Sequence, residues 1–383
     1  MAPRKKPTPP PGDRTPKLGL SFLFSAGWPY LLTPFIPIAI VLDVLGASSS
    51  AIFISSALGV VPTAALMGRA TEELAARSGP GIGGLLNVTF GNAPELIIAL
   101  FALNKGLHEV VKASIIGSIL GNILLVLGAS MFVGGLGRKR QRFRRESANA
   151  QSSMLFLAAA ALSMPAIFEL VNGHGLPSPK AELIDFGSRI ETLSIVVAGI
   201  LIFSYIAGLV FSLRTHSDVF NPPYEDEETW GWSARKSAGM LALAGLAVGG
   251  MSEILVGSIE EASHSIGLSE FFVGAIVVAI VGNAAEHWVA VLVARKDKMD
   301  LSVNIAIGSA AQIALFVAPV LVLASLFIGP VTMPLVFNGF ELAALLLAVV
   351  LANVVTNEGE SNWFEGLQLL LVWVVLAVSF AFA

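Results

Sequence analysis

A succession of long apolar runs is the feature that most constrains this chain. Runs of about 18 to 25 apolar residues recur from residue 25 to the C-terminus, and each is long enough to cross a bilayer as a helix. Only 13% of the 383 residues are charged, against about 25% in a typical soluble domain, and the mean hydropathy is +0.78. The sequence therefore predicts an all-α polytopic membrane protein.

We predict about eleven transmembrane helices, and the distribution of charge tests their order. Placing the N-terminus in the cytoplasm puts about 19 of the 23 lysines and arginines on the inner side, as expected for cytoplasmic loops. The C-terminus then lies outside. The inner cluster Arg138–Arg145 is expected to contact anionic lipid headgroups. The predicted spans lie near 25–45, 49–68, 80–103, 110–134, 149–171, 190–213, 237–257, 269–294, 301–328, 332–355 and 363–382.

Two short polar motifs lie inside these apolar runs. The first is Gly91-Asn92-Ala93-Pro94-Glu95, and the second is Gly282-Asn283-Ala284-Ala285-Glu286-His287. An ionisable side chain at membrane depth is costly and usually marks a functional site. A single buried glutamate often pairs with a lysine or caps a broken helix. Two copies with the same asparagine spacing favour a functional pair instead.

The two motifs belong to an internal duplication. Glu95 is followed by Gly117-Ser118, and Glu286 is followed at the same spacing by Gly308-Ser309, so that the offset between the copies is constant at about 191 residues. The first motif falls in the third predicted span and the second in the eighth. Because the copies are five spans apart, an odd number, they cross the membrane in opposite directions, which is the inverted-repeat plan of many secondary transporters.

The duplication predicts the division of the chain. In such transporters the site lies near the bilayer midplane on interrupted helices, and Gly91, Pro94 and Gly282 lie where interruptions are expected. One extra helix precedes two inverted five-helix repeats. The expected parts are a disordered basic, proline-rich tail (1–18), the first transmembrane helix (19–48), the first repeat (49–213), a cytoplasmic acidic loop (214–236) and the second repeat (237–383).

The side chains around the motifs offer mainly oxygen atoms. Asn92 and Glu95 share a helix face, as do Asn283 and Glu286, because each pair is three residues apart. Carboxylate, amide and hydroxyl oxygens suit a hard cation, Ca2+ in particular. Two carboxylates neutralise one divalent ion, and in its absence desolvation and mutual repulsion favour their protonation. Cation and protons therefore compete for one site, which is the minimal requirement of an antiporter.

The polar residues near the motifs have either a role in ion binding or a purely structural role. Ser118 and Ser309 supply ligand hydroxyls or bond back to the preceding helical turn. His287 is a proton relay or a histidine bonded to a carbonyl. Gln312 lies three residues after Ser309, whereas Asn122 has no counterpart, since Ile313 occupies the matching position.

Acidic residues away from the motifs suggest vestibules. Glu72, Glu73, Glu260 and Glu261 are expected to lie near opposite membrane surfaces, either lining the two vestibules or simply at the interface. A further run of acidic residues lies between the two repeats and comprises Glu225, Asp226, Glu227 and Glu228. It either attracts cations near the cytoplasmic entrance or forms a solvated turn.

The motifs resemble those of the calcium/proton antiporter (CAX) family of the cation/Ca2+ exchanger superfamily, and the resemblance covers nearly the whole chain after the tail. Asparagine in both motifs and histidine after the second glutamate are similar to the proton-coupled branch rather than the sodium-coupled exchangers. The segments that carry the resemblance are Ala70–Ala75, Gly83–Asn87, Gly91–Glu95, Gly117–Asn122, Val281–His287, Gly308–Gln312 and Ser361–Gly366.

The resemblance implies roles for individual residues. Glu95 and Glu286 would carry Ca2+ and H+ in alternation, and His287 would tune the second site. The short tail lacks the long regulatory extension of plant members, so a prokaryotic inner membrane is expected. Coordinating oxygens would come from Asn92, Asn283, Ser118, Ser309 and Gln312.

Several alternatives remain open from the sequence. The same fold could couple to Na+ or K+, or carry Mn2+, and a cation channel is a more distant alternative. No hydrolase motif is present and the chain has no cysteine, so an enzyme is not expected. We expect Ca2+, H+ and membrane lipid as partners, with no cofactor and no nucleic acid; the sequence does not predict an oligomeric state.

Overall fold

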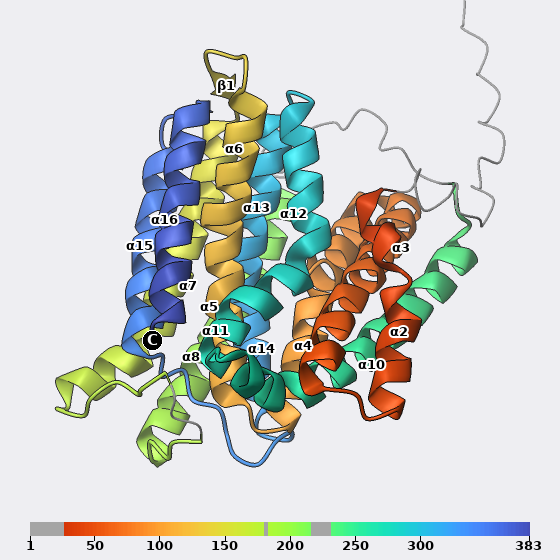
Figure 1. Cartoon of the computed structure of the whole chain (residues 1–383). Coiled ribbons are helices and arrows are strands. Elements are labelled where there is room, and N and C mark those ends of the chain that lie inside the picture. Colours follow the sequence, from red (N-terminus) through yellow and green to blue (C-terminus); the bar gives the residue numbers. More distant parts are fainter. Residues whose placement is uncertain (1–26, 180–182, 216–230) are drawn as a thin grey trace, which may run out of the picture.

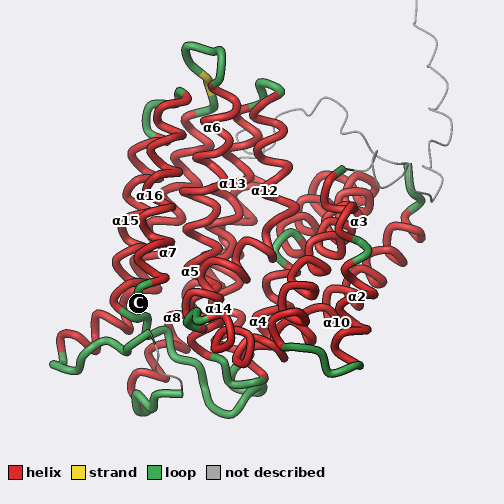
Figure 2. Tube along the Cα trace, viewed as in Figure 1, coloured by secondary structure: helices red, strands yellow, loops and turns green. Residues whose placement is uncertain are grey.

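The computed structural model describes residues 27–179, 183–215 and 231–383. Helices make up most of this part, and its strand is confined to one short pairing (Figure 2). The predicted all-α membrane architecture is confirmed. The expected tail (1–18) and the acidic residues 225–228 lie outside the described residues.

The first half of the chain begins with two short helices and ends at Thr215 (Figure 1). Its elements are η1 (Trp28–Leu32, 3-10), α2 (Phe35–Val44), α3 (Ser49–Phe90), α4 (Ala93–Asn104), α5 (His108–Leu120), η2 (Gly121–Val126, a π-helix), α6 (Leu127–Gly135), β1 (Gln141–Arg142), α7 (Arg145–Val171), α8 (Ser188–Val210) and η3 (Phe211–Thr215, π).

The second half repeats much of this pattern. Its elements are α10 (Ala234–Ile266), α11 (Glu270–Phe272), η4 (Val273–Val278, π), α12 (Ala279–Arg295), α13 (Met299–Gln312), η5 (Ile313–Val317, π), α14 (Ala318–Ala324), α15 (Gly339–Thr356), β2 (Glu360–Ser361) and α16 (Trp363–Ala381).

Nine helical stretches in the described part are long and apolar enough to cross a membrane. Two shorter apolar stretches, 28–44 and 93–104, lie where the first and third spans were predicted. The number of eleven transmembrane helices stays a prediction, because length and composition identify only candidate spans. The nine stretches are 49–78, 108–135, 145–171, 188–215, 234–266, 270–295, 299–324, 339–356 and 363–381.

Helix α3 joins two stretches that the sequence analysis assigned to separate spans. A β-carbon added to Gly83 would lie 2.5 Å from the carbonyl oxygen of Ala75. In a straight helix, residues eight apart are separated by about 12 Å along the axis, so α3 turns sharply between these residues. The sequence there contains Pro80 between two glycines, and proline cannot donate the helical hydrogen bond.

The two strands show that the repeats are inverted. β1 follows α6 and β2 follows α15, and they pair antiparallel, with Gln141 opposite Ser361. Six helical crossings separate the strands, so the chain has returned to the same side. Parallel repeats would instead bring the α6–α7 and α14–α15 connections to one side. The α14–α15 connection lies at the other end, where Gly329 packs against the carbonyl of Leu103.

The centre of the bundle is formed by equivalent parts of the two repeats. The most apolar window of the α5–η2–α6 stretch is 94% buried and that of α13–η5–α14 is 72% buried, against 17% in α16. In each stretch a π-helical segment follows the Gly-Ser pair, η2 after Ser118 and η5 after Ser309. Such segments often occur at functional sites.

The inverted arrangement predicts which loops share a side of the membrane. The chain has no cysteine, so single cysteines provide clean reporters. Lys139→Cys and Glu358→Cys should react with a membrane-impermeant maleimide from one side, and Gly175→Cys from the other. All three positions are exposed. Labelling of Lys139→Cys and Glu358→Cys from opposite sides of intact vesicles would contradict the inverted arrangement.

Close packing at Gly117 predicts a large stability effect. A β-carbon there would lie 1.9 Å from the carbonyl oxygen of Ala275, so Gly117→Ala must push α5 and η4 apart. We expect the unfolding free energy of the purified protein to fall by about 1–3 kcal/mol or more, measured by thermal or denaturant unfolding in detergent. Gly199→Ala is the matched control, because nothing lies within 4 Å of that exposed helical position. Equal stability of the two variants would contradict the packing argument.

Candidate ion-binding site

The first motif lies at a break in the helix. α3 ends at Phe90, and α4 begins at Ala93 with Asn92 as its N-cap residue. Pro94 is the second residue of α4, where its missing N–H costs nothing, and its ring prevents continuation from the preceding turn. Glu95 therefore lies in the first turn of α4, where the helix dipole favours a negative charge.

The interruption expected at Gly282 does not occur. α12 runs without a break from Ala279 through Gly282 to Arg295. The physical reason is the residue before the glutamate, because the second motif has Ala285 where the first has Pro94. The π-helix η4 lies directly before α12, so the backbone of this span is irregular before the motif and not at Gly282.

Each glutamate packs against the glycine of the opposite motif. A β-carbon on Gly282 would lie 3.0 Å from Cγ of Glu95, and one on Gly91 would lie 3.1 Å from Oε1 of Glu286. The glycines therefore let the carboxylate of one repeat approach the backbone of the other. This reciprocal contact brings the two motifs together between α4 and α12.

The two asparagines are held by their amide nitrogens. Nδ2 of Asn92 donates to Oε1 of Gln312 at 2.6 Å, and Nδ2 of Asn283 donates to Oγ of Ser118 at 3.0 Å. Nδ2 of Asn283 also donates to the carbonyl of Ala279 at 2.9 Å. Because the nitrogens are occupied, each amide presents its oxygen as an acceptor.

The paired serines have different partners. Ser309 donates from Oγ to Oε2 of Glu286 at 2.6 Å, whereas Ser118 accepts from Asn283. One serine therefore orients a carboxylate and the other orients an amide. In both cases the contact joins a motif to the helix that carries the Gly-Ser pair.

The site contains several buried acceptors that no donor satisfies. Glu95 is 5% exposed, and Asn92 and Asn283 are 1% exposed. Among the described residues, both carboxylate oxygens of Glu95 and Oδ1 of each asparagine have no hydrogen-bond partner. Unsatisfied buried oxygens are costly, so this arrangement suits a ligand that accepts their lone pairs: a cation or a proton.

The donor set indicates which cation fits. No group of three or more His, Cys, Asp or Glu side chains that could hold a metal occurs in the described part of the chain. Two carboxylates with amide oxygens form a mixed oxygen set without nitrogen or sulfur ligands. Such a set is typical of Ca2+, which takes six to eight oxygens in flexible geometry.

His287 lies beside the π-helix η2 rather than in a hydrogen bond with either glutamate. Its Cε1 would be 3.8 Å from a β-carbon on Gly121, and its buried Nε2 has no partner among the described residues. A tuning role for His287 stays a prediction.

Asn122 is a candidate that the sequence analysis set aside. It is fully buried in η2, one turn after Ser118, and neither amide atom has a partner among the described residues. Because the second repeat has Ile313 at this position, the duplication gave no signal for it. Its burial inside a π-helix is visible only in the structure.

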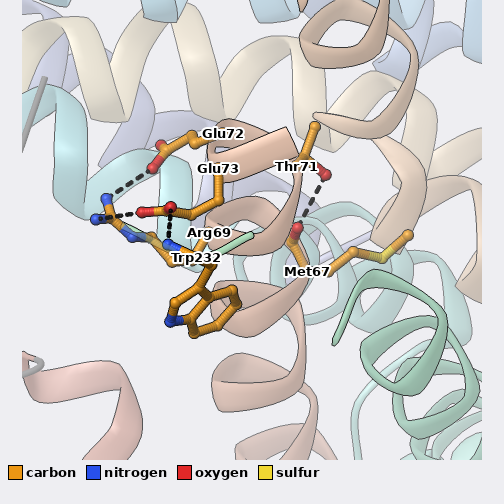
Figure 3. A network of polar contacts seen from close by, with 6 residues as sticks. All are labelled: Met67, Arg69, Thr71, Glu72, Glu73 and Trp232. Atoms are coloured by element: carbon orange, nitrogen blue, oxygen red, sulfur yellow. Dashed lines mark hydrogen bonds and ion pairs between the residues drawn. The ribbon is translucent and has the colours of Figure 1, made fainter. Parts of the chain in front are cut away.

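The acidic pair in α3 belongs to a polar network (Figure 3). Arg69 contacts Glu72 through Nη1 and Glu73 through Nη2, each at 3.1 Å, and Glu73 also accepts from the backbone N–H of Trp232 at 3.0 Å. Glu73 is 1% exposed. Glu73 is therefore held between α3 and the residues before α10, so of these two only Glu72 is accessible enough to line a vestibule.

The matching pair in α10 is exposed. Glu260 and Glu261 lie near the end of α10, and Glu261 accepts a hydrogen bond from Ser49. A vestibule role for these four glutamates stays a prediction.

Comparison with known proteins gives consistent results. Residues 48–214 and 236–382 match the sodium/calcium exchanger protein family. The chain is similar to a Ca2+/H+ antiporter of Synechocystis, with 42% identity over 92% of this chain and 96% of the relative. It is also similar to the Ca2+/H+ antiporter ChaA of Bacillus subtilis, with 44% identity over 90% of this chain and 96% of the relative.

The fold is that of a solved protein of the same group. The structure of native YfkE superposes with a TM-score of 0.78 at 39% identity, covering 93% of this chain and all of that one. The chain therefore belongs to the sodium/calcium exchanger family and, within it, to the calcium/proton antiporter (CAX) group.

Proposed function

We propose that this protein is a secondary active transporter that exchanges Ca2+ for H+ by alternating access at the site formed by Glu95 and Glu286. The observation that carries the proposal is the reciprocal packing of these carboxylates on Gly282 and Gly91, beside amide oxygens that no donor in the described part of the chain satisfies. The names of two relatives, both Ca2+/H+ antiporters, support the same exchange.

Charge neutralisation explains why the two ions exchange. One Ca2+ balances two carboxylates, and so do two protons, so either load removes the charge that resists burial. The empty site keeps two like charges in a low-dielectric environment. The loaded forms therefore change conformation readily, while the empty form does not, and transport of one ion requires return of the other.

The direction of transport follows from the basic end of the molecule. The loops that contain β1 and β2, together with the α12–α13 connection, carry most of the described basic loop residues, among them Arg138, Arg144 and Lys296. Positive loops face the cytoplasm, so this end is the inner one and the C-terminus is outside. We propose that Ca2+ leaves the cytoplasm of a prokaryotic cell across its inner membrane while H+ enters.

Reconstitution tests the exchange directly. In proteoliposomes with an acidic lumen and no Na+ or K+, we expect Ca2+ uptake that collapses when a protonophore removes the pH gradient. Uptake that requires Na+ or K+ in the lumen would contradict proton coupling. Mn2+ competition tests the cargo, and Ca2+ current without countertransport would indicate a channel.

Neutralising either glutamate should abolish exchange. Glu95→Gln and Glu286→Gln keep the side-chain shape but remove the charge that Ca2+ needs and the group that binds a proton. We expect pH-driven Ca2+ uptake to fall to the level of empty liposomes, with the protein still folded by size-exclusion chromatography. Glu358→Gln, in the exposed α15–α16 loop, is the matched control. Uptake near the wild-type rate in either site variant would overturn the assignment.

A further inference from the structure

A line of polar side chains runs along α13 from the basic end of the molecule to the ion site. Asp300, Asn304, Gly308 and Gln312 follow one another at intervals of four, so they lie on one face of this helix. Gln312 is bonded to Asn92 of the first motif. The face therefore connects the surface to the centre of the bundle.

Helix α7 contributes the facing side of this line. Oγ of Ser147 donates to Oδ1 of Asn304 at 2.9 Å, and Nε2 of Gln151 donates to the same oxygen at 3.3 Å. Both helices begin at the basic end, where the backbone N–H of Arg144 donates to Asp300 at 2.9 Å. We name the contact made by Ser147, Gln151, Asn304 and Gly308 the α7–α13 seam.

The inner end of the seam lies one residue from a serine whose hydroxyl is bonded to a glutamate. The Gln151 amide lies over Gly308, with Oε1 3.5 Å from where a β-carbon would be, and this buried oxygen has no partner among the described residues. The next residue, Ser309, donates to Oε2 of Glu286. Ser309 lies about 15 Å along the helix from its start, which is near the bilayer midplane.

The first repeat has no equivalent seam. By the 191-residue offset, Ala113 replaces Asn304, Gly121 replaces Gln312, and Gly117 replaces Gly308. Gly117 packs against the backbone carbonyl of Ala275 instead of a polar side chain. The polar line is therefore one-sided and reaches Glu286 only from the basic end.

The chemistry of the seam suits a proton better than Ca2+. Between Asp300 and Glu286 the line contains amides and hydroxyls but no carboxylate. At its outer end, Nε of Arg144 lies 3.7 Å from Oδ2 of Asp300 and already pairs with that carboxylate. A divalent cation would lose hydration there without gaining negative ligands. Hydrogen-bonded water between amide and hydroxyl groups can pass a proton without moving any ion.

We propose that the α7–α13 seam is the route by which protons pass between Glu286 and the side of the membrane that carries β1 and β2, separate from the path of Ca2+. When Glu286 is protonated, its O–H donates to Ser309, whose own proton turns toward water held by Gln151. Ser309 then gives up that proton and takes the one from Glu286, so that one proton leaves Glu286 and one reaches water. This inference rests on the proposed Ca2+/H+ exchange.

Two transport modes separate the seam from the Ca2+ site. The full-length protein is reconstituted and assayed both for pH-driven Ca2+ uptake and for exchange of radioactive Ca2+ against unlabelled Ca2+, which moves no net protons. Gln151→Met and Asn304→Leu remove the amides at similar volume. We expect pH-driven uptake to slow about tenfold or more, as for loss of a proton relay, while Ca2+/Ca2+ exchange stays within about twofold of wild type.

The matched control is Asn353→Leu. Asn353 is a half-buried asparagine of α15 whose amide donates to the carbonyl of Val349 in its own helix, and both transport modes should be unchanged when it is replaced. An equal loss of both modes in the seam variants would overturn the inference, since it would indicate a structural role. Unchanged pH-driven uptake would also overturn it. If the wild-type protein shows Ca2+/Ca2+ exchange but no proton coupling, the proposed function itself fails.

Discussion

The structure depends on bringing two carboxylates from opposite repeats into one apolar core. Glu95 packs on Gly282 and Glu286 packs on Gly91, and a β-carbon at either glycine would come within about 3 Å of the facing glutamate. The deeply buried stretches α5–η2–α6 and α13–η5–α14 surround this contact. They carry the polar residues near it, which are Ser118, Asn122, Ser309 and Gln312. An inverted duplication is a direct way to build such a pair, because it brings two copies of one motif together in opposite orientations.

Much of this arrangement could be predicted from the sequence. The constant offset between motifs and Gly-Ser pairs indicates the helices that the structure packs around the two glutamates, and membrane-length apolar runs predict the fold class. Pro94 is a local signal strong enough to interrupt a helix, and α4 does begin beside it. The same reasoning failed at Gly282, because glycine alone only weakens a helix by about 1 kcal/mol and tertiary packing keeps α12 intact.

Other features depend on long-range packing, which local patterns do not encode. The turn within α3 depends on the approach of Gly83 to Ala75, and the π-helices η2 and η5 carry no distinctive composition. Whether an asparagine offers its oxygen or its nitrogen depends on a partner more than 160 positions away, as for Asn283 and Ser118. Asn122 was undervalued because it lacks a repeat counterpart, although its burial makes it as conspicuous as the duplicated residues.

The departures from symmetry give the two glutamates different chemistry. Glu286 accepts a hydrogen bond from Ser309, whereas both oxygens of Glu95 lack a partner in the described part of the chain. Ser118, the counterpart of Ser309, is bonded to an asparagine instead. A carboxylate bonded to a hydroxyl can exchange a proton through that hydroxyl. A buried carboxylate without a hydrogen-bond donor depends on a bound ligand for stabilisation. In the exchange that we propose, Glu286 is therefore the glutamate coupled to the proton supply, and Glu95 is the one that depends more on the bound cation.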